Sequence, residues 1–253
     1  MNPPPVVLSL AGLDPSGGAG MIADVQAIAA NGGHAAAIAT CLTVQNTRDA
    51  SEVQPVALDL IRRQWQSLRA DLPLAAIKLG VLPDAGCAAL VAELLEEAGE
   101  VPVVLDPVLI ASGGGRLAEP GVIDILHARL LPRATLVTPN VHEAVALAGD
   151  ERPQSLRALG APAVLVTGAD RPGPTVRNGY AGPEGEQVWE WPRLPGRYHG
   201  SGCTLAAAAA TWLAHGAGPR TAAEQAQRYV ARSLGAGYVP GSGQHVPQRV
   251  APP

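Results

Sequence analysis

Apolar runs alternate with longer segments of helical period along most of the chain. The runs predict strands at Val6–Ala11, Ala35–Thr43, Ala75–Lys78, Val103–Asp106, Leu136–Thr138 and Ala163–Thr167. Helical spacing between them predicts helices at Ala19–Asn31, Leu58–Leu72, Asp84–Ala98, Val122–Leu131 and His142–Ala148. Repeated strand–helix units with fully apolar strands indicate an α/β protein whose mostly parallel sheet is covered by helices on both faces.

The pattern changes after Thr167. Residues 170–195 are rich in Gly, Pro and polar side chains, and Arg177–Tyr180 and Gln187–Trp191 read as short strands. This stretch predicts an antiparallel edge or a small flap rather than a second domain. Helices are expected at Gly202–His215 and Thr221–Ala236. We expect one domain over residues 1–253, with a flap at about 170–195.

Composition and charge exclude several classes of protein. Hydrophobic residues make up 47% of the chain and charged residues 16%, so a large core is expected and disorder is not. The formal charge is −4 and Lys and Arg form no run, which argues against nucleic-acid and membrane partners. Cys41, Cys87 and Cys203 are too far apart for a disulfide framework or a zinc motif. No signal peptide or membrane span is recognisable, so a cytoplasmic location is expected.

Polar or glycine-rich segments follow five of the predicted strands. They are Gly12–Gly20, Thr43–Thr47, Lys78–Leu82, Asp106-Pro107 and Thr138-Pro139-Asn140. Ligands of open parallel sheets bind at the carboxyl ends of the strands, so these segments predict one shared site.

The segment from His199 to Thr204 predicts an anion site. Small residues at Gly200, Ser201 and Gly202 let successive backbone N–H groups point at one spot, at the positive end of a helix. Fixed donors of this kind suit a phosphoryl group in transfer. Cys203 would lie at the helix start, where the pKa of a thiol is lowered. An ordinary Gly-rich helix cap beside a buried Cys is the alternative.

Asp106, Asn140 and Glu143 predict a place for hydrated Mg²⁺, which favours one or two carboxylates plus phosphate oxygens and waters. Alternatively, Asp106 caps a turn and Asn140 caps the following helix. Gly17-Gly18-Ala19-Gly20 is similar to a dinucleotide loop, which would suit an oxidoreductase. It lacks both the full spacing and the acidic residue expected about 20 positions on.

Six stretches resemble the successive motifs of the hydroxymethylpyrimidine/phosphomethylpyrimidine kinases, in family order. They are Ala11–Gly20, Leu42–Thr47, Lys78–Leu82, Leu105–Val108, Thr138–Glu143 and His199–Thr204. The resemblance implies the ribokinase-like fold, with three α/β/α layers around a mainly parallel central sheet. It also implies a homodimer that uses ATP and Mg²⁺. The expected substrate is 4-amino-5-hydroxymethyl-2-methylpyrimidine, and in many members also its monophosphate, in thiamin biosynthesis.

The resemblance also implies roles for particular residues. Cys203 would be the general base, with Gly200, Ser201 and Gly202 as the anion hole. Gln45 would bind the ring, and the pocket would be lined by Gly12, Asp14, Ala19, Val81 and Val108. Asn140 and Thr167 would serve the nucleotide phosphates, and Asp106 and Glu143 the metal. The Gln45 amide offers a donor beside an acceptor, which complements the ring's amino group and adjacent nitrogen.

Two departures from the family pattern stand out. The family's Lys-Gly-Gly-His run reads Thr167-Gly168-Ala169-Asp170 here, and a pocket Met is Val81. Two alternative functions therefore stay open: a pyridoxal or pyridoxine kinase, and a pyrimidine-binding protein without catalysis.

Overall fold

One sheet organises the protein, for which the computed structural model describes residues 3–109, 117–119 and 121–250. Within these ranges nine strands pair in the order β3-β2-β1-β4-β5-β6-β7-β8-β9. Strands β2, β1, β4, β5, β6 and β7 run parallel, whereas β3, β8 and β9 pair antiparallel at the two edges. The strands are β1 (Val6–Leu13), β2 (His34–Gln45), β3 (Ala50–Pro55), β4 (Leu74–Leu79), β5 (Val103–Leu105), β6 (Leu136–Val137), β7 (Val164–Val166), β8 (Thr175–Gly182) and β9 (Gly185–Pro192).

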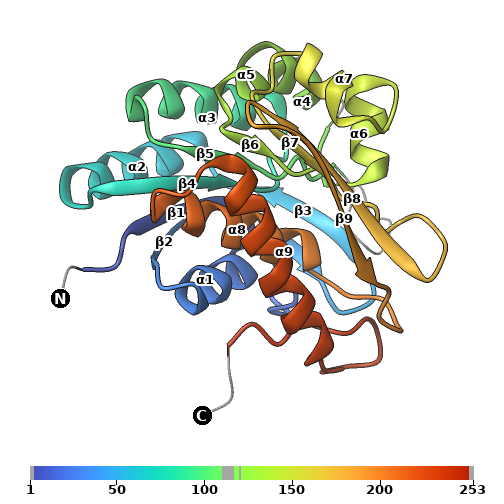
Figure 1. Cartoon of the computed structure of the whole chain (residues 1–253). Coiled ribbons are helices and arrows are strands. Elements are labelled where there is room, and N and C mark those ends of the chain that lie inside the picture. The colour runs from blue at the N-terminus through green and yellow to red at the C-terminus, as the bar shows by residue number, and fades with distance from the viewer. Residues whose placement is uncertain (1–2, 110–116, 120, 251–253) are drawn as a thin grey trace.

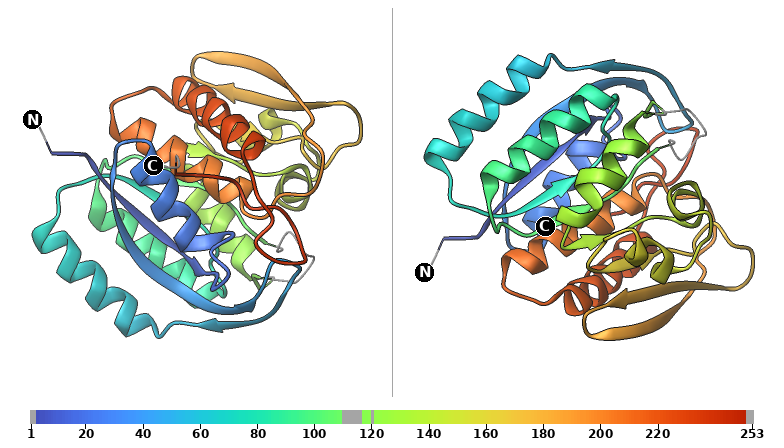
Figure 2. Two further views of the ribbon diagram at one scale, coloured as in Figure 1. Left: turned by 90° about the horizontal axis from the view of Figure 1, so that it is seen from below. Right: turned by 90° about the horizontal axis from the view of Figure 1, so that it is seen from above.

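Helices cover both faces of this sheet, as Figures 1 and 2 show. One face carries α2 (Leu58–Asp71), α3 (Ala85–Ala98), α4 (Val122–Ile125), η1 (Leu126–Leu130), α5 (Leu131–Arg133), α6 (Val141–Ala148) and α7 (Pro153–Ala158). The other face carries α1 (Gly20–Ala30), α8 (Ser201–Ala214) and α9 (Pro219–Gly235). The predicted three-layer α/β/α fold is therefore confirmed.

The two cores differ in composition. The face under α2 and α3 is packed with Leu, Ile and Val around the fully buried Trp65. On the other face, Ala206 to Ala210 of α8 are completely buried between the sheet and the helices α1 and α9. Small side chains let a central helix approach the strands closely, so α8 brings its N-terminus against the strand ends.

Most predicted elements are present within a few residues of their expected bounds. Helix α3 is a clear case: Asp84 caps its first turn by accepting a 2.7 Å hydrogen bond from Cys87 N, and Gly99 ends it with φ +66°. The predicted helix at Val122–Leu131 is present but contains one π turn, η1.

Two features differ from the sequence prediction, and a third observation decides between two predicted alternatives. Strand β3 has an exposed, polar sequence that carries no strand signal. It is stabilised by antiparallel pairing with β2. Helix α7 was not predicted; it begins at Pro153 and buries only Leu156. Of the two possibilities for residues 170–195, the structure shows the edge, because β8 pairs with β7 and β9 extends the same sheet.

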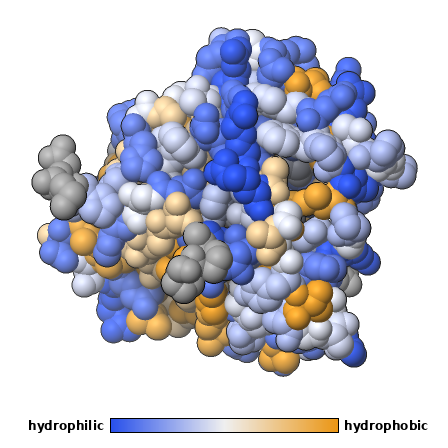
Figure 3. Space-filling model, turned by 60° about the horizontal axis from the view of Figure 1, so that its bottom comes forward, coloured by the Kyte–Doolittle hydropathy of each residue, from blue (hydrophilic) through white to orange (hydrophobic). Residues whose placement is uncertain are grey.

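Hydrophobic residues on the face in Figure 3 form small separate groups among hydrophilic ones. Among the helices of the described ranges, none combines the length and the apolar character needed to cross a membrane.

Candidate active site

The loop after β1 is folded around one buried carboxylate, that of Asp14. Its two oxygens accept 2.8 Å hydrogen bonds from the backbone N–H groups of Ser16 and Ala19. Gly20 closes the loop with φ +58°, where a Cβ would lie 2.3 Å from the carbonyl oxygen of Gly12. Only glycine fits this position, so the sequence fixes the loop against the end of β1.

His199 contacts this carboxylate from a second segment, and Gln45 contacts the His199 ring from a third. His199 Nε2 lies 2.7 Å from Asp14 Oδ2, and Gln45 Nε2 lies 3.0 Å from the same ring nitrogen. Since an ionised carboxylate only accepts, the ring nitrogen carries its proton toward Asp14. The amide nitrogen of Gln45 is then a second donor facing the same ring nitrogen, so the two do not form a hydrogen bond, and a ligand acceptor can take its place.

The pKa of Asp14 is lowered in this arrangement. Burial acts to raise it, but hydrogen bonds from His199 and Ser16 outweigh that effect. Asp14 is thus a fixed negative charge at neutral pH, and it orients the His199 ring beside Gln45.

A small apolar wall lies next to these polar groups. Val81 packs with the buried Cys41, and Val108 packs against them. A Cβ on Gly12 would lie 2.8 Å from Cys41 Sγ and 3.6 Å from Val81 Cβ. Gly12, Val81 and Val108, which were predicted to line the pocket, therefore come together around Cys41.

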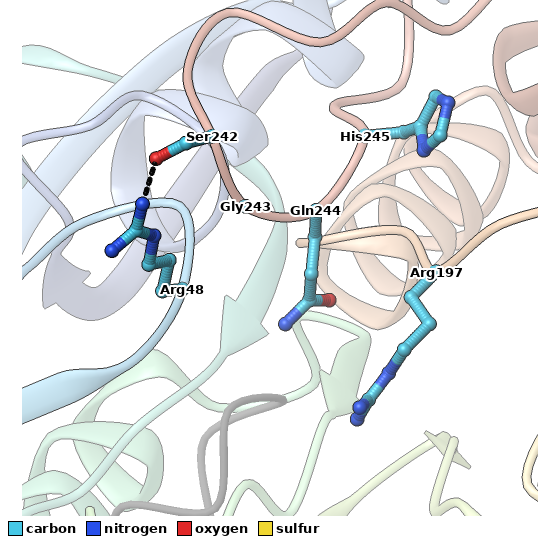
Figure 4. Close-up of a pocket in the computed structure, with 6 residues that line it drawn as sticks. All are labelled: Arg48, Arg197, Ser242, Gly243, Gln244 and His245. Atoms are coloured by element: carbon cyan, nitrogen blue, oxygen red, sulfur yellow. Dashed lines mark hydrogen bonds between the residues drawn. The ribbon is translucent and has the colours of Figure 1, made fainter.

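Two neighbouring cavities open beside Gln45. One, of about 520 Å³, is lined by Pro15, Ser16, Gln45, Asn46, Thr47, Arg48, Gly241 and Ser242. The other, of about 430 Å³, shares Arg48 and Ser242 with it and adds Arg197, Gly243, Gln244 and His245 (Figure 4). Gln45 lines the first of these cavities, and Cys203 is not among the described residues that line either of them.

The predicted anion loop, residues 199–204, leads into the first turn of α8 (Ser201–Ala214). Gly200 takes φ +79°, and a Cβ there would lie 2.0 Å from the carbonyl oxygen of Gly18. The loop before α8 therefore lies directly against the loop after β1. Ser201, Gly202 and Cys203 form the first turn of α8, whose N–H groups have no acceptor within the helix.

The expected low pKa of Cys203 is wrong for this state of the protein. Part of the residue is exposed to solvent. The thiol is surrounded by protein, and this burial raises its pKa to about 12. Lys78 acts to lower the pKa, but Asp106 and Asp24 act to raise it. The resting thiol is therefore protonated at neutral pH.

A buried set of charges lies under the anion loop. Lys78 Nζ lies 2.9 Å from Asp24 Oδ2 and 4.0 Å from Asp106 Oδ2. The Asp24 oxygen also accepts a 2.6 Å hydrogen bond from the Ser9 hydroxyl. Burial alone would lower the pKa of Lys78, but the charges of Asp24, Cys203 and Asp106 raise it. Lys78 is therefore a permanent cation.

Asp106 and Glu143, the two carboxylates predicted to serve a metal, are both buried. Burial raises the pKa of Asp106 to about 6, and burial and the charge of Asp106 raise the pKa of Glu143 well above its usual value. Asp106 Oδ2 is buried without a hydrogen-bond partner. Within the described ranges no three acidic, His or Cys side chains form a complete metal cluster. The carboxylates of Asp106 and Glu143 fit Mg²⁺, which takes its other ligands from phosphate and water.

Asn140 and Thr167 lie side by side at the ends of β6 and β7, where their backbones form a parallel bridge. The capping alternative for Asn140 is correct: its side-chain oxygen accepts from Glu143 N at 2.9 Å, and Glu143 Oε2 accepts from Asn140 N at 2.8 Å. This capping box fixes the Glu143 carboxylate.

The sequence and the fold were compared with those of known proteins. The family model described as phosphomethylpyrimidine kinase matches residues 14–248. The chain belongs to the phosphomethylpyrimidine kinase family. A hydroxymethylpyrimidine/phosphomethylpyrimidine kinase of Streptomyces coelicolor is 36% identical to this family member, over 95% of this chain and 92% of the relative.

Solved structures place this phosphomethylpyrimidine kinase family member near two kinds of kinase. Staphylococcus aureus pyridoxal kinase in complex with AMP-PCP and pyridoxal superposes with a TM-score of 0.89 at 25% identity, covering 98% of this chain and 94% of that one. Phosphomethylpyrimidine kinase of Clostridium difficile gives a TM-score of 0.79 at 27% identity, covering 91% and 99%.

Four residues in or next to the site had no predicted role. They are Asp24, Lys78, His199 and Arg249, and the last of these donates hydrogen bonds to Thr204 and Gly18. A lysine inside the apolar run Leu74–Leu79 and an aspartate on the buried side of α1 are signals of a buried ion pair. The contacts of His199 and Arg249 join segments that lie far apart in the sequence, so spacing carries no sign of them.

We predict that Gln45→Ala weakens binding of the hydroxymethylpyrimidine by about 1–3 kcal/mol, because a paired donor and acceptor are lost. Calorimetry should show nucleotide binding within twofold of wild type. Gln54→Ala, at an exposed position of β3, is the matched control. Unchanged pyrimidine affinity in Gln45→Ala would remove this residue from the site.

Lys78→Met should lower the free energy of unfolding by roughly 3–5 kcal/mol, since it leaves two carboxylates buried without their cation. Arg63→Met, which breaks the exposed pair with Asp59, should cost under about 1 kcal/mol. Chemical denaturation measures both. A Lys78→Met variant as stable as the control would mean that the buried cluster does not hold the site together.

Proposed function

We propose that this protein transfers a phosphoryl group from ATP to the hydroxymethyl group of 4-amino-5-hydroxymethyl-2-methylpyrimidine, in thiamin biosynthesis. The observation that carries this is the direct contact of the loop around Asp14 with the anion loop at Gly200. This contact brings the residues proposed to bind the pyrimidine ring, Gln45 and its neighbours, close to the residues proposed to bind the phosphoryl group.

ATP as the donor is supported by the family and by the S. aureus pyridoxal kinase, whose structure holds AMP-PCP. We propose Asn140 and Thr167 for the nucleotide phosphates and Asp106 and Glu143 for Mg²⁺. When bound, Mg²⁺ would offset the carboxylate charges that raise the pKa of Cys203, and would neutralise phosphate charge.

Cys203 is proposed as the general base. A primary hydroxyl is a weak nucleophile, so its proton must leave as the new phosphorus–oxygen bond forms. The resting thiol is protonated, so it becomes a base only after binding lowers its pKa. Lys78 acts in that direction, and the N–H groups of Gly200, Ser201 and Gly202 would stabilise the charge on the phosphoryl oxygens.

The ring is proposed to lie between the Gln45 amide and the apolar wall of Gly12, Val81 and Val108. Asp14 would act through His199, which it orients, and Ala19 would contribute through the backbone of its loop. Phosphorylation of the monophosphate uses the same anion loop and belongs to the same proposal.

The remaining family properties are also proposals. One continuous sheet supports a single kinase domain over residues 1–253. A homodimer is expected, and two half-exposed apolar residues, Leu42 and Val44, point to the same side of β2 as candidates for its surface. A cytoplasmic location stays a prediction.

A second function, phosphorylation of pyridoxal, is favoured by the similarity to pyridoxal kinases of known structure. Pyridoxal has no ring amino group for Gln45, so we expect it to be the poorer substrate.

ATP consumption should be measured with the hydroxymethylpyrimidine and with pyridoxal at equal concentrations. We expect kcat/KM to be at least about tenfold higher for the pyrimidine, since a site built to hydrogen-bond a substrate group discriminates against analogues that lack it. The 5-methyl pyrimidine, which has no hydroxyl, is the control for futile hydrolysis. Preference for pyridoxal would make the second function the main one, and activity with neither would leave a binding protein.

A further inference from the structure

A buried arginine from the C-terminal segment lies beneath the anion loop. Arg249 is only 3% exposed and its guanidinium makes four hydrogen bonds. Nε donates to Thr204 Oγ1 at 2.8 Å, Nη1 donates to Gly17 O at 3.3 Å and to Gln26 Oε1 at 3.2 Å, and Nη2 donates to Gly18 O. Every one of these acceptors is uncharged.

Within the described residues this buried positive charge is not neutralised by a direct ion pair, and Asp24 acts on it from a longer distance. Among the described residues no carboxylate lies within ion-pair distance of Arg249. Arginine does not lose its proton inside proteins, and an unpaired buried ion is costly. Such a charge is compensated when an anion binds nearby.

The guanidinium lies against the predicted anion loop. A Cβ on Gly200 would lie 2.7 Å from Arg249 Nη2, so the cation packs directly against the first residue of the anion loop. Thr204 accepts from Arg249 and donates from the same hydroxyl to Gly200 O at 2.7 Å. The guanidinium of Arg249 and the positive end of α8 therefore both lie next to Gly200.

Arg249 also joins two loops that must stay in register. Its contacts to Gly17 and Gly18 hold the loop around Asp14, and its contact to Thr204 holds the anion loop. Tyr229 of α9 fixes the arginine backbone by donating to its carbonyl oxygen at 2.8 Å. The C-terminal segment therefore sets the spacing between the ring site and the phosphoryl site.

We propose that Arg249 is a positioning residue for phosphoryl transfer: it braces the anion loop against the substrate loop and adds its charge to that site. This inference rests on the proposed kinase function. All the guanidinium contacts above are to protein atoms, so the effect is transmitted through the loops and through the electric field rather than by touching the substrate.

The test compares Arg249→Gln and Arg249→Lys with the wild-type full chain. Arg228→Gln, which removes an exposed arginine paired with Glu224, is the matched control. Steady-state kinetics gives kcat and the KM for the pyrimidine, and calorimetry gives the affinity for ADP with aluminium fluoride, a mimic of the transferring phosphoryl.

Arg249→Gln should reduce kcat about 10- to 100-fold and weaken the aluminium fluoride complex by a similar factor, while the KM for the pyrimidine shifts less than about threefold. Arg249→Lys keeps the charge but not the planar fork, so it should regain about tenfold of the lost kcat. The control should match wild type.

Equal losses of kcat in the Gln and Lys variants, or losses explained by a lower melting temperature alone, would overturn the role of the charge. If Arg249→Gln does not fold, the Lys variant decides: an aluminium fluoride affinity more than tenfold below wild type would contradict the proposal. An inactive wild type would count against the proposed function, whereas an active wild type with an unaffected Arg249→Gln counts against Arg249.

Discussion

The buried ion pair between Lys78 and Asp24 is the interaction on which the rest of the site depends. Lys78 comes from the centre of the sheet and Asp24 from α1, and Asp106 lies within 4.0 Å on the neighbouring strand end. A Cβ on Gly80 would lie 2.8 Å from Lys78 Nζ, so the chain makes room for this amine. One cation thus fixes a helix and two strand ends relative to each other, directly below Cys203.

Burial and the charge balance of this cluster together explain the state of the thiol. Burial is the largest cause: it raises the pKa of Cys203 to about 12 and the pKa of Asp106 to about 6. Two carboxylates, Asp24 and Asp106, outnumber the single Lys78, so the net charge of the cluster does not offset the effect of burial. Both shifts act in the direction that a bound cation reverses. Catalysis by Cys203 should increase as pH rises, because a larger fraction of the thiol is then ionised.

The sequence predicted the fold because its strands carry their own signal. Fully buried strands such as β1 read as apolar runs, and α3 has both of its caps in the sequence. Strand β3 gave no such signal, because its exposed residues depend on pairing with β2. Glycines with positive φ, such as Gly20 and Gly200, marked the loops of the site correctly as places where the backbone turns tightly.

The same reasoning could not find the groups that act through distant contacts. His199 is placed by Asp14, which lies 185 residues away in the chain, and Arg249 is placed by Gly17, Gly18 and Thr204. It also predicted the wrong direction for the pKa of Cys203, because the helix start is visible in the sequence, whereas the burial of the thiol and the carboxylates around it are not. Local chemistry is readable from spacing, whereas the electrostatic balance of a site requires its three-dimensional neighbours.

The most direct test of this account is the single-turnover rate of phosphoryl transfer in Cys203→Ala. Loss of a general base should reduce that rate about 10²–10⁴-fold while the affinity for the pyrimidine changes little. Cys203→Asp should recover part of the rate, and Cys87→Ala, at a buried position of α3, is the control. A Cys203→Ala rate within a few-fold of wild type would contradict the role of the thiol, and catalysis would then rest on the anion loop and the surrounding charges.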